Sequence, residues 1–136
     1  MVSFHISYQG QLRCEATHDP SLVRMITDAP TDNQGRGESF SPTDLVATGL
    51  GVCMLTTMAI AVQKENVILD GSRVYVEKHM SKEPPRRIVK IATKVEFAPG
   101  VSKDRRPFLE HIARTCPVAK SIHPDIDVAI TFIYPD

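Results

Sequence analysis

The chain of 136 residues is long enough for one domain and short for two, so we expect residues 1–136 to form a single domain. With 42% hydrophobic and 24% charged residues it has the composition of a globular protein, which excludes a disordered or collagen-like chain. Its 16 basic residues balance 16 acidic ones, so we expect neither a nucleic-acid partner nor a membrane-surface partner.

The beginning of the chain predicts three short strands. Residues 2–8 alternate apolar and polar side chains, and Gln9-Gly10 supplies a turn into a returning strand over 11–16. A break at His18-Asp19-Pro20 precedes a third strand over 22–27. Residues 28–40 are rich in Asp, Gly, Asn and Pro, which predicts a loop.

A long apolar helix is predicted next, over residues 42–65. Ser41 is a good N-cap, Pro42 suits the first helical position, and Asp44 completes a capping box. Gly49 and Gly51 each cost the helix about 1 kcal/mol relative to Ala, which suggests a closely packed partner helix. Residues 45–62 carry no charge and reach the lower limit for a membrane span, but the threonines, the glycines and the missing basic flank favour a buried helix.

The rest of the chain predicts two strands, two helices and a last strand. A strand lies within 67–79, and another spans 88–97 with one apolar face. Ser102 is expected to cap a helix that runs to about Thr115, and Pro117 can open a short helix over 118–122. A strand over 126–134 ends the chain. The order predicts an α+β fold in which a sheet or a second copy covers the apolar helix.

Three cysteines, Cys14, Cys53 and Cys116, are too few and odd in number for a secreted disulfide framework. No basic-then-apolar signal peptide begins the chain, so we expect a cytoplasmic protein with free thiols. From position alone, Cys14 is structural and Cys53 is a small buried hydrophobe of the long helix. Cys116 precedes a proline at a predicted helix N-terminus, where unpaired amides favour a thiolate.

Metal and cofactor signals are weak. His111, Cys116 and His123 have no close pair of ligands to anchor a zinc site. Gly35-Arg36-Gly37 does not continue into a phosphate-binding fingerprint. We therefore expect no metal and no cofactor.

Several motifs together resemble the OsmC/Ohr family, named after osmotically inducible protein C and organic hydroperoxide resistance protein. They are Ser41-Pro42-Thr43-Asp44-Leu45 through Cys53-Met54, the strand Lys94 to Phe97, and Thr115-Cys116-Pro117-Val118. The resemblance covers nearly the whole chain. It implies an intertwined homodimer in which antiparallel sheets wrap two long central helices and the active sites lie at the interface.

The resemblance also implies a thiol peroxidase that reduces organic hydroperoxides in oxidative or osmotic stress. By position, Cys53 matches the thiol that attacks the peroxide and becomes a sulfenic acid. Cys116 matches the thiol that resolves this sulfenic acid to a Cys53–Cys116 disulfide. An external dithiol, in this family a protein that carries a lipoyl group, then reduces the disulfide.

The chain departs from the family where the thiolate is stabilised. Family peroxidases carry a Glu that orients an Arg toward the thiolate, and here Thr43 occupies that position. The neighbouring Asp44 is a carboxylate but also suits the helix cap. Arg36, with Glu38 as its possible partner, is the favoured cation, and Arg13 and Arg24 are alternatives. This departure leaves a second possibility open, a small-molecule-binding or stress-response dimer with little or no peroxidase turnover.

Overall fold

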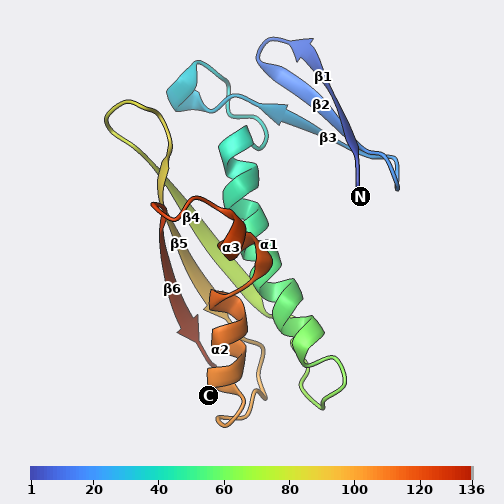
Figure 1. Ribbon diagram of the computed structural model, residues 1–136, viewed down its shortest axis with the longest axis vertical. Helices are drawn as coiled ribbons and strands as arrows, with labels where there is room; N and C mark the ends of the chain where they lie inside the picture. Colours follow the sequence, from blue (N-terminus) through green and yellow to red (C-terminus); the bar gives the residue numbers. More distant parts are fainter. Residues whose placement is uncertain (136) are drawn as a thin grey trace. The chain divides into compact units, whose positions relative to one another are not determined.

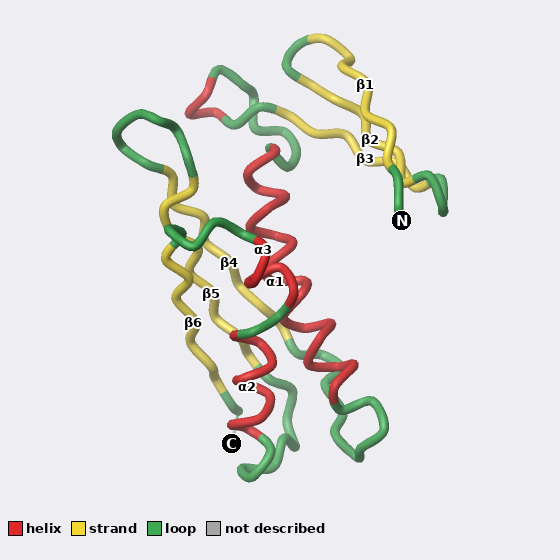
Figure 2. The backbone as a smooth tube through the Cα atoms, viewed as in Figure 1, coloured by secondary structure: helices red, strands yellow, loops and turns green. Residues whose placement is uncertain are grey.

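The computed structural model describes residues 1–135 and divides the chain into two compact units. The first unit is Met1–Val46, and the second begins at Ala47. Figure 1 shows the order of the elements along the chain, and Figure 2 separates helices, strands and loops. The single domain expected for residues 1–136 stays a prediction.

The first unit contains the antiparallel sheet β1-β2-β3, formed by β1 (Phe4–Gly10), β2 (Arg13–His18) and β3 (Val23–Asp28). The three expected strands are thereby confirmed. The register places Tyr8 opposite Cys14 and Ile6 opposite Ala16. Because side chains alternate across a strand, these residues share one largely apolar face. The face is exposed, with Ile6 and Tyr8 at 64% and 66%.

The loop between β3 and the long helix contains one short 3-10 helix, η1 (Thr31–Asn33). The helix α1 (Pro42–Ala61) follows, and its start matches the expected capping box. The Asp44 amide donates to Ser41 Oγ at 3.1 Å, and the Ser41 amide donates to Asp44 Oδ2 at 2.9 Å. These two bonds satisfy backbone donors that a helix leaves free at its N-terminus.

Helix α1 ends at Ala61, so the expected end near Glu65 was wrong. Beyond Ala61 the chain makes tighter turns, in which the Gln63 amide donates to Ile60 and the Glu65 amide donates to Val62. Residues 63–66 are polar and exposed. They have no apolar face to bury, and packing of such a face is what stabilises most helices in proteins.

The second unit contains the sheet β4-β5-β6, formed by β4 (Arg73–Met80), β5 (Ile88–Glu96) and β6 (Asp127–Ile133). Strands β4 and β5 are antiparallel, whereas β5 and β6 are parallel. Parallel neighbours need a long crossover, and α2 (Arg106–Arg114) with α3 (Pro117–Ser121) provides it. The α+β fold class is confirmed, with an antiparallel first sheet and a mixed second sheet.

The expected start of the second helix at Ser102 was wrong, because α2 begins at Arg106 with Arg105 as its N-cap. The Ser102 carbonyl instead accepts the Arg105 amide in a turn that precedes the helix. Pro107 then lies in the first turn of α2, where the missing amide donor of a proline costs nothing.

Figure 1 shows the helices on one face of the sheet β4-β5-β6, and the core of the second unit is made of residues of these helices and of the sheet. On α1, Leu50, Met54 and Met58 are fully buried, at helical spacing. A Cβ added to Gly51 would lie 2.8 Å from Val76 Cγ2 on β4. Gly51 therefore allows the strand β4 to approach α1 closely. The sequence suggested that a helix packs at this position, and that prediction was wrong. Gly49 has open space around it.

Helix α1 is long and apolar enough to cross a membrane by length and composition, with 28% of its most apolar window buried. The core helix of a soluble protein passes the same test. Fully buried Leu50, Met54 and Met58 pack with Ile91 and Val95 of the sheet, as expected of a core helix.

Candidate thiol site

Cys53 lies in the middle of α1 and is partly buried. It packs against the core of the second unit. One turn further along α1, the Thr57 hydroxyl donates to the Cys53 carbonyl at 2.6 Å. Cys53 therefore holds a fixed place on a rigid helix while part of its surface stays accessible.

Cys116 lies between α2 and α3 and is 1% exposed. It is the N-cap residue of α3 and has an extended backbone, as a residue just before a proline usually has. Its neighbours in the core include Leu109 and Ala113 of α2. The sequence predicted the proline-led helix start, and the structure shows that the thiol beside it is buried in the core.

The structure brings Cys53 and Cys116 together, although α1 and α3 are far apart in the sequence. Burial raises the pKa of the Cys116 thiol above its usual range, and the adjacent Cys53 thiol raises it further by hydrogen bonding and by charge. The backbone amides of Ala119 and Val118 act in the opposite direction, because they favour the thiolate. Both cysteines are free. The two thiols are therefore neighbours, and each is in the reduced form.

In the first unit, a cluster of charged residues surrounds Arg13 of β2. Arg13 Nη2 lies 2.5 Å from Glu38 Oε2 and 3.5 Å from Asp28 Oδ2. The Glu38 amide also donates to Asp28 Oδ2 at 3.0 Å, and this bond does most to hold the pKa of Asp28 below its usual range. The carboxylates raise the pKa of Arg13.

The expected pairing of Glu38 with Arg36 was wrong, because Glu38 pairs with Arg13. Arg36 is exposed and makes no ion pair within residues 1–135. Asp28 was missed by the sequence reasoning. It stands directly opposite Arg13 in the β2–β3 register, a signal that becomes visible only once the register of the hairpin is known.

Asp44 and Thr43 lie at the N-terminus of α1. Asp44 completes the capping box with Ser41, and the Thr43 hydroxyl lies 3.3 Å from the Ser41 hydroxyl. These bonds are typical of a helix cap. An additional role toward the thiolate stays a prediction.

No group of three or more His, Cys, Asp or Glu residues that could hold a metal ion occurs in the described part of the chain. His123 Nδ1 instead accepts the Asp125 amide at 3.0 Å.

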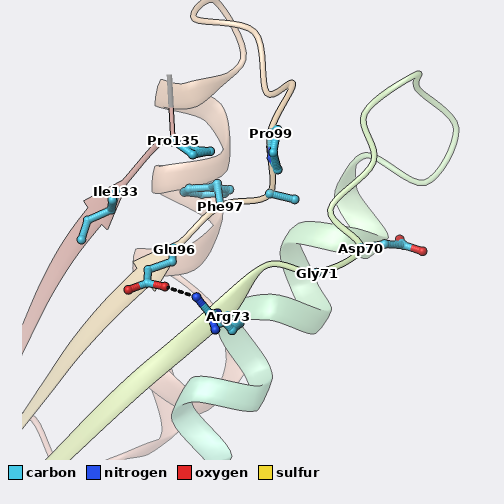
Figure 3. A pocket seen from close by; sticks show the side chains of 9 residues that line it. Asp70, Gly71, Arg73, Glu96, Phe97, Pro99, Ile133 and Pro135 are labelled. Carbon is cyan, nitrogen blue, oxygen red and sulfur yellow. Dashed lines mark hydrogen bonds and ion pairs between the residues drawn. The ribbon is translucent and has the colours of Figure 1, made fainter.

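A surface hollow of about 370 Å³ lies at one end of the sheet β4-β5-β6 (Figure 3). An ion pair between Arg73 and Glu96, 2.9 Å long, crosses one side of it, and Phe97 lies close by. Neither Cys53 nor Cys116 is among the residues that line it. The hollow is therefore separate from the thiol pair.

The fold and the thiol pair together define a class of protein. It is a small α+β protein in which a long helix carries one cysteine, and a second cysteine lies next to the first at a proline-led turn. Residues 35–131 match the model of the OsmC family, described as OsmC-like protein. The chain belongs to the OsmC-like family. No functionally curated protein matches it by sequence.

Solved structures agree with this assignment. A protein of Psychrobacter arcticus 273-4, provisionally assigned to osmotic stress induction and the detoxification response, is 41% identical, with a TM-score of 0.88 over 98% of this chain and 96% of that one. The organic hydroperoxide resistance protein OsmC of Legionella pneumophila is 16% identical, with a TM-score of 0.76 over 98% and 96%. An OsmC-like protein of Mycoplasma pneumoniae is 15% identical, also at 0.76, over 98% and 95%. The last two show a shared fold.

Proposed function

We propose that this protein is a thiol-dependent peroxidase that reduces organic hydroperoxides through Cys53 and Cys116, in defence against oxidative or osmotic stress. The single observation that carries the proposal is the meeting of the two thiols, one partly exposed and one buried. Membership of the OsmC-like family supports the substrate class, since structural neighbours include an organic hydroperoxide resistance protein.

The reaction begins when the Cys53 thiolate attacks the distal oxygen of the hydroperoxide. The O–O bond breaks, an S–O bond forms, and the alkoxide takes a proton to leave as an alcohol. The Cys116 thiolate then attacks the Cys53 sulfenic sulfur, the S–S bond forms, and the hydroxyl leaves as water. One hydroperoxide and two thiols thus give one alcohol, one water and one disulfide. The apolar surroundings of Cys53 favour an organic hydroperoxide over hydrogen peroxide.

The catalytic cycle closes when an external dithiol reduces the Cys53–Cys116 disulfide by thiol–disulfide exchange. A lipoyl-bearing protein is the reductant expected from the family resemblance. The reaction needs neither metal nor cofactor, because both electrons come from the thiols.

The cation that stabilises the Cys53 thiolate is a further part of the proposal. The sequence favoured Arg36, and Arg13 and Arg24 were alternatives. Arg13 is held between Glu38 and Asp28, Arg24 Nη1 lies 3.9 Å from Glu15 Oε1, and Arg36 is exposed. Single replacements of the three arginines by Met separate the candidates, because only loss of the stabilising cation slows oxidation of Cys53 by a hydroperoxide. If no variant slows it, the requirement for one of these arginines is wrong.

We also propose that the protein acts as a homodimer. Large apolar side chains are exposed on α1, with Val52 at 56% and Ile60 at 64%, and on the apolar face of the sheet β1-β2-β3. Exposed apolar surface of this extent marks an interaction site, and a second copy is the simplest partner because closed symmetric pairs are the commonest oligomers. Sedimentation at micromolar concentration should give about twice the 15.1 kDa of one chain. A mass near that of one chain would contradict the dimer.

The decisive experiment on the chemistry is the intact mass of the reduced protein after one equivalent of cumene hydroperoxide. We expect a rapid loss of about 2 Da, mapped to a Cys53–Cys116 disulfide. A reduced mass that stays constant, with both thiols still titratable, favours the second candidate, a small-molecule-binding or stress-response dimer without turnover. The observation that favours this second candidate is Thr43, at the position of the Glu that family peroxidases carry.

A further inference from the structure

The two sulfurs of the proposed disulfide differ in accessibility. Cys116 is 1% exposed and is enclosed by residues of the second unit, whereas Cys53 is only partly buried. Contact with a second copy can add cover to either residue, but it cannot uncover Cys116. An external thiol therefore has access from solvent to only one end of the S–S bond.

We propose that the reductant attacks the disulfide at Cys53 and releases Cys116 as the leaving thiolate, so that the mixed disulfide with the reductant forms on Cys53. The proposal rests on the proposed function, because it specifies how that disulfide is reduced. The attacking thiolate forms a new S–S bond to Cys53 Sγ, and the Cys53–Cys116 bond breaks with its electron pair on Cys116 Sγ. The second thiol of the reductant then attacks the reductant sulfur that is bound to Cys53. This closes the disulfide of the reductant and releases the Cys53 thiolate.

Two effects decide which sulfur leaves, and they act in opposite directions. A thiol of lower pKa leaves faster, and burial raises the pKa of Cys116. Accessibility has the opposite effect, because exchange at Cys116 requires the reductant to reach an enclosed sulfur. Accessibility is the stronger factor, since a sulfur that the reductant cannot reach does not react, whatever the pKa of the thiol that would leave.

The surroundings of Cys116 also support its release. Burial is the largest cause of its raised pKa, but the next two causes that raise it come from the neighbouring Cys53 thiol. Once Cys53 is bound to the reductant it has no thiol proton and no charge, so this part of the penalty disappears. The amides of Ala119 and Val118, which favour the thiolate, remain beside Cys116. The departing sulfur thus carries its negative charge close to these amides.

The test uses the full chain with Cys14→Ser, which leaves only the two thiols of interest. Diamide oxidises them to the disulfide, and a short pulse of glutathione opens it. Excess N-ethylmaleimide in guanidinium at neutral pH then stops the exchange and blocks the released thiol, which unfolding makes accessible, and peptide mass spectrometry locates the glutathione. We expect about tenfold more glutathione on Cys53 than on Cys116, with the maleimide on Cys116.

Unfolded protein is the matched control. The same disulfide treated with glutathione in guanidinium should lose the preference, because both sulfurs are then accessible. Equal labelling of the folded protein, or an excess of glutathione on Cys116, would overturn the proposal. Failure of diamide to link the two cysteines would also overturn it, since the sulfurs would then not meet.

The proposal and the proposed function fail in different ways. Diamide makes the disulfide without any peroxide, so the site of glutathione attachment is measured even in a protein that does not react with hydroperoxides. A protein that cumene hydroperoxide leaves reduced, but whose diamide-made disulfide opens at Cys53, would refute the peroxidase and retain the order of exchange.

Discussion

The two units of the chain bury their apolar side chains to very different extents. In the second unit, helices cover one face of a three-stranded sheet, and Leu50, Met54 and Ile91 are completely buried. In the first unit, the apolar face of the sheet β1-β2-β3 is exposed, and only Thr27 and Asp28 among its strand residues are buried. The second unit therefore has a core of its own, whereas the first depends on another surface to cover it.

This difference also separates two kinds of chemistry. The second unit holds a sulfur pair at its apolar core, with Cys116 enclosed and Cys53 partly exposed. The first unit holds an arginine between two carboxylates, where charge and hydrogen bonds fix the side chain. We therefore expect substitutions in the second unit to act on the reaction and on the stability of a single chain. Substitutions in the first unit, apart from those of the candidate arginines, should act on assembly and on the pH dependence of stability.

Replacement of one cysteine in each unit should give the largest contrast. We expect Cys53→Ser to reduce consumption of cumene hydroperoxide to the background rate, because a serine hydroxyl does not replace the thiolate nucleophile. Cys14→Ser should consume hydroperoxide at the rate of the unchanged protein, since Cys14 lies in a strand of the first unit. The measurement is a hydroperoxide assay with excess dithiothreitol. An inactive Cys14→Ser protein that is still folded would contradict this separation.

Replacement of one large apolar side chain by alanine in each unit should show whether that side chain is buried within one chain or by a second copy. Leu50→Ala removes a fully buried side chain, and we expect it to lower the free energy of unfolding by about 2–5 kcal/mol. Ile6→Ala removes an exposed side chain and should matter mainly through assembly, because a second copy would cover it.

Urea unfolding at several protein concentrations measures both effects. The loss caused by Leu50→Ala should appear at every concentration. In Ile6→Ala, the free energy of unfolding should depend less on protein concentration than it does in the unchanged protein. A loss for Ile6→Ala that is large and independent of concentration would show that the first unit buries this side chain within one chain.

The sequence predicted the elements of both units better than their environments. Alternation, the capping box and the prolines identified the strands and the start of α1 because these signals are local. The parallel pairing of β6 with β5 and the contact of Gly51 with Val76 depend on tertiary packing, so no local pattern contained them. The end of α1 was wrong because residues 63–66 could continue a helix but have nothing to bury.

The same limit applies to the candidate site. The family motifs singled out Cys53 and Cys116, and the structure brings them together. The sequence could not show that Cys116 is enclosed, because its burial results from α2 packing on the sheet. It also could not choose the partner of Glu38. That choice follows from the β2–β3 register, which places Arg13 opposite Asp28.

The two glycines of α1 offer a smaller test. An alanine at position 51 would place its Cβ 2.8 Å from Val76 Cγ2, and the branched valine side chain has little freedom to move. We expect Gly51→Ala to destabilise the protein by about 1–3 kcal/mol through overpacking. Gly49→Ala meets open space in the single chain and should stabilise the helix by up to about 1 kcal/mol.

Thermal unfolding of the two variants, combined with sedimentation, checks this prediction. A Gly49→Ala variant that is less stable and also shifts toward the mass of one chain would show that a second copy packs closely at this glycine. A stable Gly51→Ala variant would contradict the close packing of α1 on β4.

The smallest expected effect is on the charged cluster of the first unit. The amide of Glu38 and the charge of Arg13 hold the pKa of Asp28 below its usual range, although burial opposes them. A carboxyl whose pKa is lower in the folded state stabilises the protein above its unfolded pKa of about 4. That contribution disappears as the pH falls through the lower, folded-state pKa. Asp28→Asn removes the charge, so the unchanged protein should exceed the variant in stability at pH 7 and lose this advantage below about pH 4.

Urea unfolding between pH 7 and pH 3 measures that difference, with Asp70→Asn as the matched control. Asp70 is an exposed carboxylate of the second unit, and its replacement should change the free energy of unfolding by less than about 0.5 kcal/mol. Equal stability of Asp28→Asn and the unchanged protein at pH 7 would mean that the cluster does not stabilise the first unit. Asp28 and Glu38 would then hold Arg13 in place without adding to the stability of the protein. That result is expected if Arg13 serves the reaction instead of the fold.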